Sequence, residues 1–116
     1  VLILDEPTTG LDYLECCHIM DRIRRMNREK QVTVVMVCHD MEVVLDYADR
    51  ALVMAGGRLL ADGPVSQVFR NRELMQQASI LPPQMIDLAA RLDFPDANTP
   101  EEVAEHILKA GKGVRA

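Results

Sequence analysis

The sequence predicts an α/β fold with parallel strands, a β-hairpin and a C-terminal helical extension. Two continuous apolar runs, residues 1–4 (VLIL) and 32–38 (VTVVMVC), are typical of parallel strands that are covered on both faces. Residues 14–28 lie between them and carry apolar side chains at helical spacing, which indicates a strand–helix–strand unit. Gly56-Gly57 then separates two short apolar segments, a pattern that favours a hairpin.

The remaining elements follow from turn and capping signals. We expect a short helix over residues 40–48, and hairpin strands near 51–54 and 58–61. After Gly63-Pro64 the chain is predicted to be helical, over residues 65–69, 73–78 and 84–92. Thr99-Pro100-Glu101-Glu102 is a capping box with Pro at the first helical position, and it predicts a last helix that stops at Gly111.

The composition is that of a globular domain. The chain has 116 residues, of which 48% are hydrophobic and 27% charged, so a disordered or fibrous class is not indicated. A net charge of -5 argues against a nucleic-acid-binding surface, which is usually basic. No apolar run approaches the ~20 residues that span a bilayer, so we expect membrane association only through a partner. Three cysteines, two of them adjacent, fit a reducing compartment better than a disulfide framework.

Charged side chains follow both predicted parallel strands. Asp5-Glu6 comes at the end of the first strand and His39-Asp40 at the end of the second. Ligands bind beyond the carboxyl ends of strands in open parallel sheets, so both pairs are expected to face one crevice. Two carboxylates suit a hydrated Mg²⁺, and a histidine can stabilise a developing phosphate charge. Asp5-Glu6 alone is commonly a turn or cap, and His39 alone is commonly an ordinary strand-terminal histidine, but their joint occurrence favours a functional site.

These motifs resemble those of ABC-type ATPases. VLILDEP is similar to the Walker B strand, TTGLD to the D-loop, and VVMVCHD to the switch-histidine strand. ADRALVMAGGRLLADGPVSQVF is similar to the segment that follows the switch histidine in transporter ATPases. The resemblance covers residues 1–69 and implies part of a P-loop, RecA-like ATPase core. Residues 70–116 resemble, more weakly, the C-terminal extension of the ATPases of energy-coupling-factor transporters, which import vitamins or metal ions such as cobalt and nickel.

The resemblance implies roles for four residues. Asp5 would hold Mg²⁺, through water, and Glu6 would be the general base that orients the attacking water. Asp12 would lie in the D-loop, which communicates across an ATP-sandwich dimer, and His39 would contact the γ-phosphate. ATP and Mg²⁺ are the implied cofactors. The implied partners are a second ATPase subunit, a transmembrane coupling protein and a substrate-binding membrane component, with the ATPase at the cytoplasmic face of the membrane and no nucleic acid.

The sequence departs from the family pattern in one major respect. The phosphate-binding G-x-x-x-x-G-K-[ST] loop is absent, and Gly111-Lys112-Gly113 lacks its earlier glycine. The LSGGQ signature and the Q-loop are absent as well. All three lie upstream of Walker B in the family, so we expect this chain to be the C-terminal half of an ABC ATPase and to be inactive in isolation.

Three alternatives remain open at this point. A soluble ABC ATPase of DNA repair or translation shares the same motifs, although such proteins usually carry a coiled coil or a basic extension. A phospho-receiver domain also binds Mg²⁺ with acids after a strand, but it needs an acceptor Asp where this chain has His39. The chain could also be a non-catalytic interaction module. Two apolar helical stripes in the tail, which include Val103, Ile107 and Leu108, further predict that it contributes to self-association.

Overall fold

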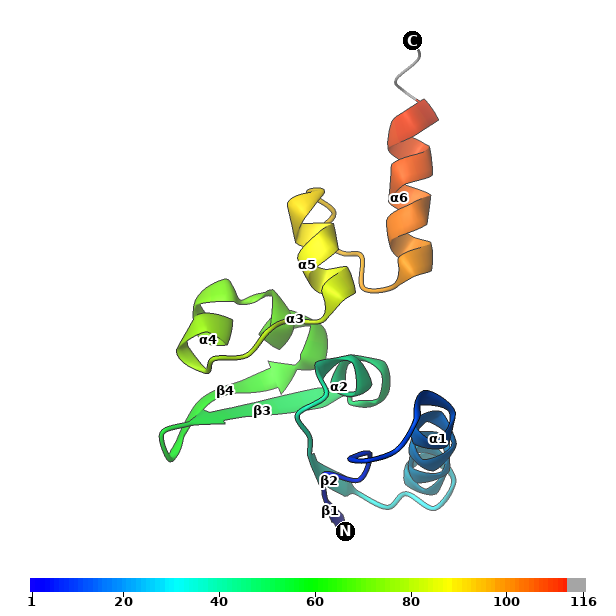
Figure 1. Ribbon diagram of the computed structural model, residues 1–116, viewed down its shortest axis with the longest axis vertical. Coiled ribbons are helices and arrows are strands. Elements are labelled where there is room, and N and C mark those ends of the chain that lie inside the picture. Colours follow the sequence, from blue (N-terminus) through cyan, green and yellow to red (C-terminus); the bar gives the residue numbers. More distant parts are fainter. Residues whose placement is uncertain (113–116) are drawn as a thin grey trace. The chain divides into compact units, whose positions relative to one another are not determined.

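The computed structural model describes residues 1–112, which form two compact units. The first unit is Val1–Tyr47 and the second begins at Ala48. Figure 1 follows the chain through the strands and helices of both units. None of the helices in the described residues is long and apolar enough to cross a bilayer. Gly113, the last residue of the glycine–lysine motif considered above, lies outside the described part of the chain.

The first unit is built on a parallel pair of strands. β1 (Leu2–Asp5) pairs with β2 (Val34–Val37), and α1 (Tyr13–Glu29) lies between them in sequence. The register places Leu2 opposite Val34 and Asp5 opposite Val37, so the two strands end at the same level. This confirms the α/β class and the strand–helix–strand unit.

One expectation for these strands is wrong in the structure described. The apolar runs predicted strands covered on both faces, but burial alternates along each strand. Ile3 is 73% exposed and Val35 is 45% exposed, whereas their neighbours Leu2, Leu4 and Val34 are half-buried. Successive side chains of a strand point to opposite faces. The described residues therefore cover one face of this sheet and leave an apolar face open.

Two helices complete the first unit and contact each other through Arg24. α2 (Met41–Tyr47) follows β2. The Arg24 guanidinium lies 4.5 Å from the centre of the Tyr47 ring and also donates to the backbone oxygen of Asp46. Burial raises the pKa of Tyr47, and a hydrogen bond with Cys17 raises it further. A cation over an aromatic face is attractive, so these contacts fasten the end of α2 to α1.

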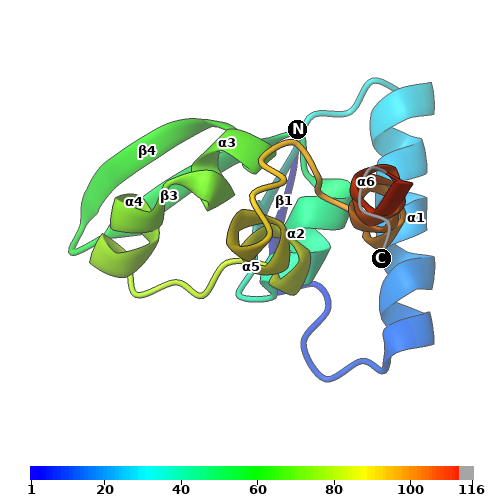
Figure 2. The ribbon, with the colours of Figure 1, turned by 90° about the horizontal axis from the view of Figure 1, so that it is seen from above.

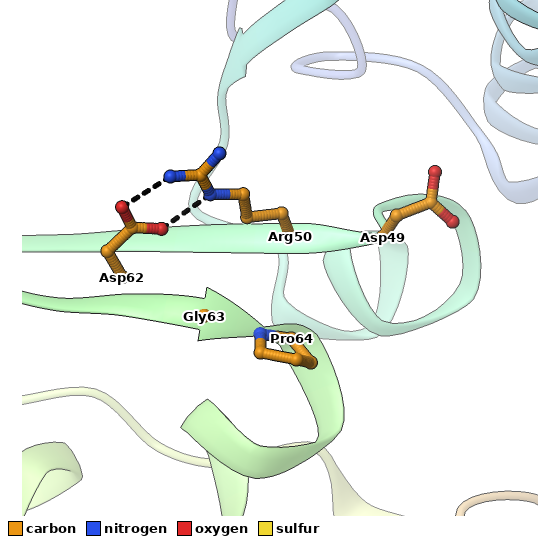
Figure 3. Close-up of a pocket in the computed structure, with 5 residues that line it drawn as sticks. All are labelled: Asp49, Arg50, Asp62, Gly63 and Pro64. Carbon is orange, nitrogen blue, oxygen red and sulfur yellow. Dashed lines mark hydrogen bonds and ion pairs between the residues drawn. The ribbon is translucent and has the colours of Figure 1, made fainter.

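The second unit begins with the predicted hairpin. β3 (Arg50–Ala55) and β4 (Arg58–Pro64) are antiparallel, and both glycines of the turn are left-handed, with φ of 57° at Gly56 and 73° at Gly57. Two positive φ values define the type I′ turn that matches the twist of the strands. Arg50 and Asp62 form a bidentate pair with both bonds at 2.5 Å, beside a cavity of about 280 Å³ (Figure 3). This hydrogen bonding lowers the pKa of Asp62.

Within residues 65–112, four helices follow the hairpin and supply most of the core of this unit. They are α3 (Val65–Arg70), α4 (Arg72–Gln77), α5 (Gln84–Arg91) and α6 (Pro100–Lys112). Buried side chains come from α3 to α6 and include Phe69, Met75, Ile86 and Val103. The capping box of the last helix is confirmed, because Thr99 and Glu102 bond each other's backbone N–H groups. Gly111 does not end this helix as predicted: α6 continues to Lys112.

Candidate functional site

The backbone brings the ends of the two parallel strands together. The N–H of Glu6 donates to the oxygen of Val37 at 2.8 Å, which extends the ladder between β1 and β2 by one residue. Glu6 is thereby fixed directly beyond β1, and His39 follows Val37 by two residues. The shared edge therefore carries one candidate base and one candidate phosphate-binding side chain, as the sequence predicted.

Two successive turns connect Glu6 to α1. Thr9 N–H donates to the oxygen of Glu6 at 3.2 Å, and Leu11 N–H donates to the oxygen of Thr8 at 3.3 Å. Gly10 occupies the left-handed region with φ of 79°, where a glycine carries no Cβ penalty. This loop runs from the end of β1 to the first turn of α1, as Figure 2 shows.

Glu6 itself has an unusual backbone. Its φ is 48°, in the left-handed region that costs an ordinary residue about 1–2 kcal/mol. Such conformations persist when the surroundings impose them, and they cluster at functional sites. Here the pairing with Val37 on one side and the turn to Thr9 on the other impose the conformation.

The carboxylate of Glu6 has a separate partner for each oxygen. Oε1 contacts Nδ1 of His39, across 33 residues of sequence, and Oε2 accepts a hydrogen bond from Oγ1 of Thr9 at 3.3 Å. The Glu6 side chain is 27% exposed, whereas that of His39 is 87% exposed. A carboxylate held in this way can accept a proton from a bound water, and the exposed imidazole is available to an approaching anion.

The other two predicted site residues, Asp5 and Asp12, do not join this pair. Asp5 is exposed, and its side chain makes no hydrogen bond or ion pair within the described residues. Asp12 is the N-cap of α1: its Oδ1 accepts from Glu15 N–H at 2.9 Å, while Asp12 N–H donates to Oε2 of Glu15 at 3.3 Å. The Asp12 carboxylate is therefore occupied in a capping box.

The residues present fit a magnesium ion only in part. Residues 1–112 contain no cluster of three or more side chains placed to hold a metal. Mg²⁺ commonly takes one or two protein carboxylates and completes its shell with water and phosphate oxygens. The unpaired carboxylate of Asp5 is suited to such a shared site, and it lies next to Glu6 in the sequence.

Two positioning residues were missed by the sequence reasoning. In the sequence, Thr9 stands out only as part of the D-loop motif, although its spacing of three from Glu6 suits a turn. Asp40 is the cap of α2, because its Oδ1 accepts from Glu42 N–H at 3.1 Å and from Val43 N–H at 3.3 Å. This cap fixes the chain directly after His39. An Asp immediately before an apolar helical pattern is the signal that would have revealed it.

Comparisons with known proteins show which proteins the chain is similar to. It is 38% identical over 115 residues, 99% of its length, to a putative ABC transporter ATP-binding protein of Vibrio vulnificus. It is 43% identical over 98 residues, 84% of its length, to one of Vibrio parahaemolyticus, and 44% identical over 92 residues, 79% of its length, to one of Methanosarcina mazei. The chain is homologous to ABC transporter ATP-binding proteins. No family model matches it.

A solved structure agrees with this relationship. CbiO1 of Clostridium perfringens, described as part of the ABC transporter complex CbiONQ, superposes with a TM-score of 0.56 at 30% identity. The match covers 79% of this chain and 36% of that one. It confirms the mixed α/β fold as part of an ABC ATPase core. The chain spans about a fifth or less of the length of the relatives from Vibrio and Methanosarcina, whose matched shares are 20%, 17% and 15%.

Proposed function

We propose that this chain belongs to the ATP-hydrolysing subunit of an ABC-type importer of the energy-coupling-factor kind, which takes up metal ions or vitamins. The contact between Glu6 and His39 at the ends of two parallel strands carries the proposal. It joins a potential general base to a potential phosphate-binding side chain, with the free carboxylate of Asp5 adjacent in sequence.

The side chains divide the chemistry of ATP hydrolysis between them. Glu6 orients the attacking water and accepts its proton through a carboxylate that His39 and Thr9 hold in place. His39 presents its exposed imidazole to the γ-phosphate. Asp5 holds the magnesium ion of the nucleotide, through water. A magnesium ion held there would supply charge neutralisation at the phosphate oxygens. Asp12 belongs to the D-loop that faces a second ATPase subunit, in addition to capping α1.

The proposal extends to the domain, the partners and the location of this site. We assign residues 1–69 to the C-terminal part of the ATPase domain and residues 70–116 to an extension that is helical over much of its described part. The partners are a second ATPase subunit, a transmembrane coupling protein and a substrate-binding membrane component, at the cytoplasmic face of the membrane. The relatives named above are transporter proteins, and CbiO1 belongs to a transporter complex. Both observations support transport over DNA repair or translation.

The experiment is Glu6→Gln in the full-length protein. The amide keeps the shape of the side chain and its hydrogen-bonding reach, but it cannot accept a proton. We expect ATP turnover to fall by about 10²–10⁴-fold while ATP binding is retained. The 116-residue chain alone should show no turnover, because it lacks the phosphate-binding loop. Near-normal turnover of the full-length Glu6→Gln protein would contradict the assignment of Glu6 as the base.

A further inference from the structure

The proposed function leaves open what sets the orientation of the Glu6 carboxylate. We propose that Thr9 is a positioning residue for ATP hydrolysis, which acts by donating a hydrogen bond from its hydroxyl to the Glu6 carboxylate. The inference rests on the proposed role of Glu6 as the base. Within the described residues, the one side-chain hydrogen bond of Thr9 is the 3.3 Å bond to that carboxylate.

The geometry explains why a second contact is needed. The last torsion of a glutamate joins an sp³ and an sp² carbon, and its rotamer wells are broad. The contact of His39 with Oε1 fixes the position of one oxygen, but it still allows the plane of the carboxylate to rotate. The bond from Thr9 to Oε2 fixes the second oxygen and therefore the plane of the group.

Thr9 is well placed to supply this bond because the same turn holds it. Its N–H donates to the backbone oxygen of Glu6 at 3.2 Å, so the backbone that carries the hydroxyl is held close to the glutamate. His39, in contrast, belongs to another segment, and its side chain is 87% exposed. We therefore assign to Thr9 the orientation of the Glu6 carboxylate, and to the exposed imidazole of His39 the contact with the phosphate.

The expected effect is on the chemical step. A poorly oriented base lowers the rate without weakening the binding of nucleotide. The bond is long and solvent-exposed, so its loss should lower kcat by about three- to tenfold, the range of a modest hydrogen bond. The KM for ATP should stay within about twofold, since Thr9 is not assigned a contact with nucleotide.

The test compares three variants in the full-length protein. Thr9→Val keeps the β-branched shape and the backbone turn but removes the hydroxyl, and Thr9→Ser keeps the hydroxyl. Thr33→Val is the matched control, because Thr33 is exposed and has no side-chain hydrogen bond within the described residues. We expect lower kcat with unchanged KM for Thr9→Val, near-normal kcat for Thr9→Ser, and no change for the control. Thermal melting and ATP affinity, measured without turnover, should match among the three.

Several results would overturn the inference and leave the proposed function intact. These are a normal kcat for Thr9→Val, a change confined to KM, or a loss in Thr9→Ser as large as that in Thr9→Val. The last would assign the effect to the methyl group rather than to the hydroxyl. The proposed function fails separately, through near-normal turnover of Glu6→Gln.

Discussion

Replacing His39 by alanine should separate catalysis from stability. The imidazole is the most informative side chain to remove because it belongs to the proposed site yet packs against little. Its side chain is 87% exposed, and within the described residues its one hydrogen-bonding contact joins Nδ1 to Oε1 of Glu6. The cap of the following helix comes from Asp40 rather than from His39, so the helix start is preserved.

The size of each effect follows from these contacts. Surface substitutions away from caps and cores usually change stability by no more than about 0.5 kcal/mol, and exposed ion pairs contribute about 0–1 kcal/mol. In contrast, the loss of one donor that stabilises transition-state charge costs about 10²–10³ in kcat, or about 2.7–4 kcal/mol. We therefore expect the full-length His39→Ala protein to lose at least about 99% of its turnover while its melting temperature is nearly unchanged.

The chain offers a matched control for this measurement. His18 lies on α1, is exposed, and makes no side-chain hydrogen bond, ion pair or ring contact within the described residues. Phosphate release and thermal melting would be measured for His39→Ala and for His18→Ala in the full-length protein. His18→Ala should retain normal turnover. Equal activity of the two variants would refute the role of His39, and a large fall in the melting temperature of His39→Ala would assign it a structural role instead.

Two further predictions concern the helix cap and the tail. Asp12→Ala should lower the stability of α1 by about 1 kcal/mol, seen as faster amide exchange of Glu15 in the full-length protein. Asp12→Asn should not, because the amide oxygen can still accept from Glu15 N–H; equal exchange in both variants would contradict the cap. Leu108→Glu should weaken self-association of full-length subunits in sedimentation without lowering the melting temperature, because Leu108 is 67% exposed while Val103 of the same stripe is buried. An unchanged dimer fraction would show that this part of α6 is not at the interface.

Local patterns predicted the elements well, because helical spacing, capping boxes and paired glycines act within a few residues. They also predicted that Asp5-Glu6 and His39-Asp40 would face one crevice, since parallel strands end at one edge; the contact between Glu6 and His39 is a finding of the structure. The left-handed backbone of Glu6 could not be predicted. A residue before proline is biased toward extended conformations, and here the pairing with β2 and the following turn override that bias. The spacing of Asp12 and Glu15 matches a capping box. Because Asp12 is also part of the D-loop motif, the sequence does not distinguish its capping role from a role in the site.

The segment from Glu6 to Asp12 links the candidate base to the rigid part of the first unit. At one end, Glu6 N–H is bound to the oxygen of Val37, beyond the last pair of the sheet. At the other end, Asp12 caps α1 through Glu15. Because both ends are anchored to regular elements, the two turns between them have little freedom, and a left-handed Glu6 can be maintained at its energetic cost. The orientation of the Glu6 carboxylate therefore depends on the whole strand–helix–strand unit. Substitutions that weaken the cap of α1 should also disturb that orientation, because the segment from Glu6 to Asp12 connects the two.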